Sequence, residues 1–157
     1  RDIDISPDGN SVAAVIGDGS IFKLDVATGN TEILAHIGGE QLYDVEFSVD
    51  GTKLITAATY AVVWDVDTGE RVLQFEAPVG MEGGVFHLAI SNDGHIVAGA
   101  DTHGTLAFWD MTTGDVLAVR SVGAEDANYC MTFNPAGSVL ATCEHDEMLR
   151  LWAVLDQ

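Results

Sequence analysis

The chain has few basic residues, only two cysteines and no long apolar stretch. The first shortage argues against two classes of partner, and the last argues against a membrane-spanning helix. Lysine and arginine together number 6, against 25 aspartates and glutamates, so the net charge is −19. Such a charge repels the phosphates of nucleic acids and of anionic membranes, and we expect neither as a partner. No apolar stretch approaches the roughly 18 residues that a membrane-spanning helix needs.

The remaining composition predicts one folded domain. The 157 residues are enough for a single domain with a sizeable core and hardly for two. Hydrophobic residues make up 47% of the chain and are spread evenly, which argues against disorder. Strand-like residues already begin at Arg1, which is not methionine, and we expect the chain to be part of a longer protein.

A unit of about 43 residues occurs four times. Its first marker is a turn glycine, and successive turn glycines are 42, 43 and 43 residues apart. The four are Gly9, Gly51, Gly94 and Gly137, and aspartate precedes the first three. Asp-Gly between two alternating apolar runs predicts a hairpin, because glycine accepts positive φ and aspartate bonds the nearby backbone.

A second marker keeps the same period. It consists of Leu24-Asp25, Trp64-Asp65, Trp109-Asp110 and Trp152-Ala153. Each of the three aspartates is followed four residues later by a Thr-Gly glycine, which predicts a second turn. We therefore expect Asp25, Trp64, Asp65, Trp109, Asp110 and Trp152 to have structural roles.

Four short strands are predicted in each period, and no segment has a convincing helical periodicity. The clearest examples, in chain order within a repeat, are Leu42–Phe47 and Val85–Ile90, then Lys53–Ala57 and Ile96–Ala100, then Ala61–Asp65 and Leu149–Trp152, and finally Arg71–Phe75 and Val116–Val119. Short strands at this spacing indicate an all-β protein, and their recurrence about every 43 residues favours a β-propeller.

The Trp-Asp dipeptides and the turn Ser6-Pro7-Asp8-Gly9, at this period, resemble WD repeats. The resemblance covers nearly the whole chain, with repeats at about residues 1–40, 41–84, 85–127 and 128–157. It implies propeller blades of four antiparallel strands and a non-catalytic scaffold whose faces bind other proteins. Two other functions stay open: a small-molecule-binding or enzymatic propeller that uses its central channel, or a structural segment of a larger protein.

The repeats depart from the family pattern in a bonding network that stiffens each blade. That network links a histidine, a serine or threonine and an aspartate to the tryptophan. The aspartate position holds Asp18 and Asp146 in the first and last repeats, but Ala58 and His103 in the second and third. We therefore expect the full network in no blade.

Fifteen strands are predicted, so the last blade lacks its outer strand. The family usually closes rings of six to eight blades, and an open row leaves apolar faces at both ends. Three arrangements stay open: a fragment of a longer propeller, two copies that complete an eight-bladed ring as a homodimer, or four blades that close alone.

The loops between the second and third strands of the repeats carry most of the candidate binding residues. These are Asp18, Tyr60, Asp101, His103, Glu144, His145 and Asp146. They suggest a binding face for a protein or peptide partner, and their acidic residues favour a basic one. No spacing matches a metal site or a catalytic motif, so we expect no metal, no cofactor and no catalysis.

Acidic residues occur in the loops of both faces, which suggests adaptation to a high-salt host.

Cys130 and Cys143 lie across one predicted hairpin, so a disulfide between them is geometrically conceivable. Two sparse cysteines are more often small buried residues of a reducing cell. We therefore expect free thiols and a cytoplasmic protein.

Overall fold

The computed structural model describes residues 1–121, 128–144 and 147–154, which form fifteen β-strands and no helix. Within these ranges there is accordingly no helix long and apolar enough to cross a membrane. The strands are β1 (Asp2–Ile5), β2 (Ser11–Val15), β3 (Ser20–Asp25), β4 (Thr31–His36), β5 (Asp44–Phe47), β6 (Lys53–Ala57), β7 (Ala61–Asp65), β8 (Arg71–Phe75), β9 (His87–Ile90), β10 (Ile96–Ala100), β11 (Thr105–Asp110), β12 (Val116–Ser121), β13 (Asn128–Phe133), β14 (Val139–Glu144) and β15 (Leu149–Ala153).

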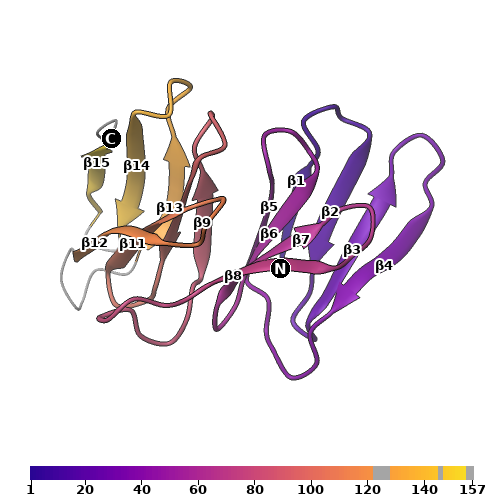
Figure 1. Cartoon of the computed structure of the whole chain (residues 1–157), viewed down its shortest axis with the longest axis horizontal. Helices are drawn as coiled ribbons and strands as arrows, with labels where there is room; N and C mark the ends of the chain where they lie inside the picture. The colour runs from indigo at the N-terminus through magenta and orange to yellow at the C-terminus, as the bar shows by residue number, and fades with distance from the viewer. Residues whose placement is uncertain (122–127, 145–146, 155–157) are drawn as a thin grey trace.

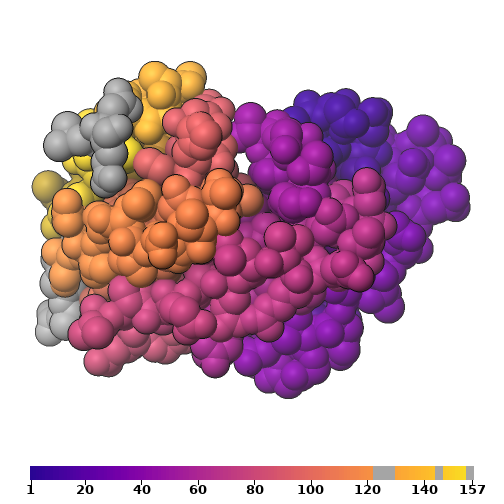
Figure 2. Space-filling view, viewed as in Figure 1, coloured from indigo at the N-terminus to yellow at the C-terminus, as the bar shows by residue number. Residues whose placement is uncertain are grey.

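The strands form four antiparallel sheets that follow one another along the chain (Figure 1). The first three sheets each contain four consecutive strands, and the fourth contains β13, β14 and β15. We call these sheets blades 1 to 4. Figure 2 shows blade 1 at one end of the long axis and blade 4 at the other. The predicted all-β architecture is thus confirmed, including a last blade with three strands.

Several strands have the bounds that the repeat pattern predicts. The strands β6, β7, β8 and β10 begin and end at the predicted residues. The inner strands β5 and β9 begin two residues later than predicted. Their ladders start only after Tyr43 and Phe86, whose N–H groups donate single bonds to the carbonyls of Ala57 (2.9 Å) and Ala100 (2.8 Å).

The first turn of each of the first three repeats is fixed by a serine and an aspartate. In blade 1, Ser6 Oγ donates to Asp8 at 2.6 Å, Asp8 accepts from the Asn10 N–H at 3.0 Å, and Gly9 has a φ of 73°. The same bond joins Ser48 to Asp50 and Ser91 to Asp93. These bonds favour the ionised carboxylate and lower the pKa of Asp8. The ionised form of the aspartate therefore stabilises the turn more than the protonated form does.

The second turn is closed by the aspartate of the Trp-Asp position. Asp25, Asp65 and Asp110 accept hydrogen bonds from the backbone N–H groups of Thr28 (2.7 Å), Thr68 (3.0 Å) and Thr113 (2.8 Å). Asp65 also accepts from Lys53 Nζ at 2.7 Å. Bonds to the charged form hold the pKa of these carboxyls below its ordinary value, that of Asp65 most of all.

The tryptophans of blades 2 and 4 occupy equivalent positions. Trp64 Nε1 donates to Thr56 Oγ1 at 2.9 Å, and Trp152 Nε1 donates to Thr142 Oγ1 at 3.0 Å. Each bond ties the third strand of its blade to the second and satisfies an indole N–H that would otherwise be buried without an acceptor.

Blade 1 holds a different part of the same network. Ser20 donates its backbone N–H to Asp18 at 2.9 Å, and its hydroxyl lies 3.1 Å from His36 Nδ1. Leu24 occupies the tryptophan position, so the indole N–H that the family network includes is missing from this blade.

In blade 3, a glycine leaves the space that the buried tryptophan ring occupies. Gly99 stands where blades 2 and 4 have the threonine, and Trp109 Nε1 donates instead to the carbonyl of Glu76 at 3.0 Å. A Cβ added at Gly99 would lie 2.8 Å from the indole and 2.9 Å from Val85 Cγ1. The fully buried ring of Trp109 therefore requires a glycine beneath it.

Gly99→Ala is expected to destabilise the chain by about 1 to 3 kcal/mol, because an added methyl group overpacks a filled core. Chemical denaturation measures the change. Gly38→Ala is the matched control, since its Cβ would meet only His36 Nε2 at 3.9 Å. Equal stability of the two variants would contradict the packing argument.

The expectation of free, buried cysteines is wrong. Cys130 on β13 and Cys143 on β14 are directly paired across the hairpin, with a Cα–Cα distance of 5.2 Å, and form a disulfide. A register shift between Asn128 and Cys130 accompanies the pairing. Cys130 is exposed, so the bond lies where reductants reach it.

Reduction of the disulfide is expected to lower the free energy of unfolding by about 3 kcal/mol, as the closure of a loop of about this length predicts. Denaturation with and without dithiothreitol measures the effect. The double variant Cys130→Ala and Cys143→Ala should have the same free energy of unfolding as the reduced wild type, and dithiothreitol should not change it. An unchanged midpoint on reduction would show that the bond contributes nothing.

Candidate interaction surfaces on the inner strands and loops

The inner strands of blades 1 and 2 carry carboxylates that reach the next blade. Asp2 and Asp4 on β1 accept from the backbone N–H groups of Val45 (3.2 Å) and Phe47 (2.7 Å) on β5. Asp44 and Glu46 on β5 repeat the pattern with Leu88 (2.8 Å) and Ile90 (2.9 Å) on β9. These four bonds join blades 1 to 2 and 2 to 3, and we call them the carboxylate clasp.

The repeat pattern contained a signal for the clasp that our sequence reasoning missed. Asp2 and Asp44 are 42 residues apart, as are Asp4 and Glu46. Acidic residues that return at the repeat period, on a strand that is otherwise apolar, indicate a position with a repeated function.

The clasp crowds negative charge, and its carboxyls respond differently. Burial and repulsion by Asp44 and Asp4 raise the pKa of Glu46 to about 8. Burial also raises the pKa of Asp2, and a hydrogen bond with Asp44 adds to the shift. Asp44 is desolvated too, but bonds from His87 and its other partners outweigh that effect and lower its pKa. Of these carboxyls, Glu46 thus holds a proton most readily.

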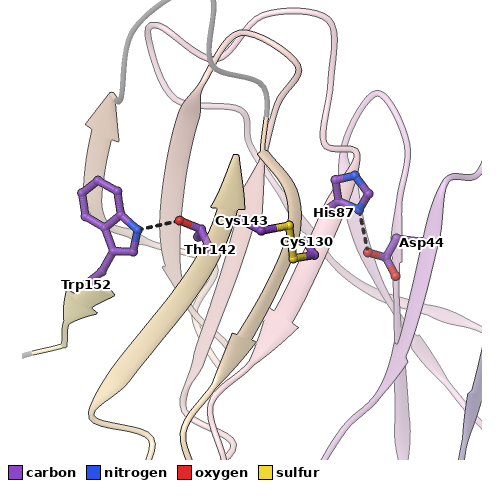
Figure 3. Close-up of a disulfide and its surroundings, with 6 residues drawn as sticks. All are labelled: Asp44, His87, Cys130, Thr142, Cys143 and Trp152. Atoms are coloured by element: carbon purple, nitrogen blue, oxygen red, sulfur yellow. Dashed lines mark hydrogen bonds and ion pairs between the residues drawn. A yellow bond between two sulfur atoms is a disulfide. The ribbon is translucent and has the colours of Figure 1, made fainter. Parts of the chain in front are cut away.

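The clasp ends at blade 3. His87 and Ala89 occupy the two positions on β9, one repeat after Asp44 and Glu46. Figure 3 shows His87 directed back toward Asp44, and its Nδ1 lies 3.7 Å from Asp44 Oδ2. Cys130, at the next equivalent position, is bonded within its own blade. The third junction is therefore built without carboxylates from β9.

A row of rings lies at the start of the inner strands. The rings of Tyr43 and Phe86 are tilted against each other with centroids 4.2 Å apart. The guanidinium of Arg1 lies 5.2 Å from the Tyr43 centroid, so it covers the next place in the row. All three residues occupy the same position in successive repeats, and both rings are only half-buried. This aromatic row was also missed from the sequence.

The predicted loop residues fall into two groups. Asp18, Tyr60 and His103 are exposed, the tyrosine to 39%. Beside Tyr60, the hydroxyl of Thr59 donates to Glu40 at 2.6 Å, which joins two loops of the same face. These side chains are therefore available to a partner.

Asp101 belongs to the other group, and its placement on an exposed loop surface is wrong. It is 0% exposed, and its carboxylate accepts the backbone N–H groups of Glu82 (2.9 Å), His103 (2.8 Å) and Thr105 (2.7 Å). The loop before β9 folds over it, so Asp101 positions two loops and does not face solvent. Glu144 is the last residue of β14, and His145 and Asp146 lie outside the described residues.

In the described ranges, no three histidine, cysteine or acidic side chains are arranged to hold a metal ion. A groove of about 950 Å³ lies between blades 3 and 4, beside β15. It is lined by Phe108, Leu117 and Trp152, together with Asp110 and Arg120. In the described part of the chain, β15 pairs with β14 only, and no further strand adds to this sheet.

A family model for the WD domain, G-beta repeat, matches residues 69–110 and 119–153. The chain belongs to the WD-repeat family. A WD repeat-containing protein of Schistosoma mansoni, SL1-17, is 25% identical over 155 residues, which cover 98% of this chain and 50% of that protein. Topless-related protein 1 of Arabidopsis thaliana is 28% identical over 117 residues, which cover 70% of this chain and 10% of that protein.

The fold of this WD-repeat chain is also found in solved structures. A chain in the crystal structure of a mitotic checkpoint complex superimposes with a TM-score of 0.84 and 16% identity, over 96% of this chain and 45% of that one. The chain spans half or less of the length of these relatives. WD-repeat proteins generally mediate protein–protein interactions or act as scaffolds.

The clasp of this WD-repeat chain should make its stability depend on pH through Glu46. Its pKa in the folded chain, about 8, lies above the ordinary 4.5, so folding holds a proton that the unfolded chain releases between these values. The contribution of this group to stability should therefore fall as pH rises through that window. Glu46→Gln keeps an acceptor for Ile90 and does not titrate.

Between pH 5 and pH 9, the stability of Glu46→Gln relative to wild type is expected to rise by up to about 4 kcal/mol. Urea denaturation across this pH range measures the gain. The exposed residue Glu70 provides the control variant Glu70→Gln, which should leave the pH dependence of wild type unchanged. Parallel curves for Glu46→Gln and wild type would contradict the buried-proton argument.

Proposed function

We propose that this chain is a WD-repeat interaction module that binds a basic segment of a partner protein. The binding surface is the face that carries the loops between the second and third strands of the blades, which we call the loop face. The observation that carries the proposal is the contact of a guanidinium with the aromatic row. Arg1 lies over Tyr43, so a ring of this row already accepts a planar cation from within the chain. Phe86 continues the row in the next blade.

The charge around the row favours a cationic partner. The exposed Asp18 carboxylate and the half-buried Glu40 lie in loops of the same face, and Asp2 and Asp44 begin the clasp one residue beyond Arg1 and Tyr43. The whole chain carries −19, which steers a basic partner and repels an acidic one. Aromatic rings supply the contact area that such polar surroundings lack, and Tyr60 is an exposed ring on this face.

Binding of an arginine- and lysine-rich peptide tests the proposal, with a peptide of the same length that has glutamate at the basic positions as its counterpart. Fluorescence anisotropy should show binding of the basic peptide only, weakened by salt. Tyr43→Ala and Tyr60→Ala should each weaken it by about fivefold or more.

Val49→Ala is the control variant, because Val49 is 48% exposed in a turn of the opposite face. It should bind the basic peptide as wild type does. Equal affinity for the two peptides, or an effect of Val49→Ala as large as that of the tyrosine variants, would overturn a basic-partner site on the loop face.

A further inference from the structure

The connection between β8 and β9, residues 76–86, runs from blade 2 to blade 3 and is longer than this step requires (Figure 1). The equivalent connection between β4 and β5 joins blade 1 to blade 2 with residues 37–43. Seven residues are thus enough to pass from the outer strand of one blade to the inner strand of the next, whereas the second connection has eleven. We call residues 76–86 the long loop. Its extra length indicates a role beyond linking two blades.

Hydrogen bonds fix the first half of the long loop to blade 3. At the start of the loop, the carbonyl of Glu76 accepts from Trp109 Nε1 at 3.0 Å. In its middle, the carbonyl of Gly80 accepts from Thr105 Oγ1 at 2.8 Å. Both donors lie on β11, so the loop is anchored on the strand that it crosses.

The end of the long loop is fixed to blade 2. The N–H of Val85 donates to the carbonyl of Ala58 at 2.8 Å. Gly84 lies so close to the same segment that an added Cβ would be 2.7 Å from the Ala58 oxygen and 3.0 Å from Thr59 Cα. The long loop therefore packs directly against the loop that carries Tyr60.

Buried Asp101 joins the long loop to the loop between β10 and β11. Its Oδ2 accepts from the N–H of Glu82 at 2.9 Å, and its Oδ1 accepts from the N–H groups of His103 (2.8 Å) and Thr105 (2.7 Å). One carboxylate oxygen thus holds the long loop, and the other holds its neighbour. The two functions of this side chain can be separated by changing a single atom.

Val79 is the apolar residue that this framework leaves in solvent. The N–H of Met81 donates to the carbonyl of Pro78 at 3.1 Å and closes a turn around Val79. Met81 is 9% exposed, whereas Val79 is 100% exposed. A side chain on a backbone that is already fixed loses little conformational entropy when it contacts a partner. Val79, together with Tyr60 on the adjacent loop, is therefore suited to an apolar contact.

The charge around the long loop complements a basic partner. Glu76 and Glu82 are exposed, and no lysine or arginine occurs between Arg71 and Arg120. Acidic surroundings attract basic side chains, while an exposed valine gains only from an apolar one. The combination fits a segment that carries both kinds of side chain.

We propose that the long loop makes the loop face selective for amphipathic basic segments. Val79 contacts an apolar side chain of the segment, and Asp101 is the positioning residue that holds the loop in its binding conformation. This inference rests on the proposed function, because it names the class of basic segment that binds there. Electrostatic attraction alone would not distinguish such a segment from a purely polar one of equal charge.

Two peptides of equal length and equal positive charge test the proposal, one with leucine and the other with serine between its basic residues. Fluorescence anisotropy should show that wild type binds the leucine peptide about tenfold more tightly. Val79→Ser should weaken binding of the leucine peptide by about fivefold and leave that of the serine peptide unchanged. Val49→Ser is the matched control, since Val49 is 48% exposed on the opposite face, and it should bind both peptides as wild type does.

Asp101→Asn tests the positioning role separately. Asparagine keeps an oxygen for the N–H groups of His103 and Thr105, but it places an NH₂ group opposite the N–H of Glu82 and so releases the long loop. The variant should lose most of the preference for leucine, still bind the serine peptide, and exchange the Glu82 amide hydrogen faster. Adding Val79→Ser to it should change little, because the released loop no longer presents the valine.

The outcomes distinguish this inference from the proposed function. Equal affinity of wild type for the two basic peptides would overturn the inference and leave the proposed function intact, as would an unchanged leucine preference in Val79→Ser. Failure of both basic peptides to bind would overturn the two together. If Asp101→Asn keeps the leucine preference, or loses binding of both peptides, Asp101 does not act through the long loop.

Discussion

The arrangement of the blades depends on how the inner edge strand of each sheet satisfies its outward backbone N–H groups. An edge strand presents donors that no neighbouring strand accepts. In blades 2 and 3 these donors are those of Val45, Phe47, Leu88 and Ile90, and a carboxylate of the preceding blade accepts each one. One bond therefore satisfies an orphan donor and fixes the neighbouring blade. Because the acceptors alternate along the strand, they also fix the register between blades.

This solution concentrates charge in a chain that is already strongly acidic. Four carboxyls on two adjacent strands cannot all ionise without mutual repulsion, and burial adds to the penalty. The molecule responds by holding a proton on Glu46, where the pKa rises to about 8, and by placing His87 beside Asp44. The aspartates of the turns behave in the opposite way. Hydrogen bonds from serine, threonine and backbone groups lower the pKa of Asp8, Asp25 and Asp110, so those carboxylates carry their charge at the rim.

The repeat predicted the strands well because their signals are local. Turn glycines, the Trp-Asp position and apolar alternation lie within a few residues of the strands that they define, and β6, β7, β8 and β10 match their predicted bounds. The clasp could not be read in this way, since Asp4 and its partner Phe47 are 43 residues apart. Asp101 is an acidic residue in a predicted loop, so the sequence alone places it on the exposed surface. Only the fold of the loop that carries Glu82 shows that it is buried. Pairing of the two cysteines likewise depends on the register of β13 against β14.

Blade 4 differs from the others in how its stability is distributed. In a row of repeats, stability is approximately the sum of the stability of each unit and of its junctions with its neighbours. Blade 4 joins blade 3 without clasp carboxylates, and it has three strands in the described part of the chain. Its first strand bears Cys130 at the position where blades 1 and 2 bear Asp2 and Asp44, and that side chain bonds to Cys143 of the same blade. The same position of the repeat thus has two roles. In blades 1 and 2 its side chain bonds to the next blade, and in blade 4 it forms a disulfide within a single hairpin. Because a cross-link acts within its own unit, it offsets a weaker junction without requiring a neighbour.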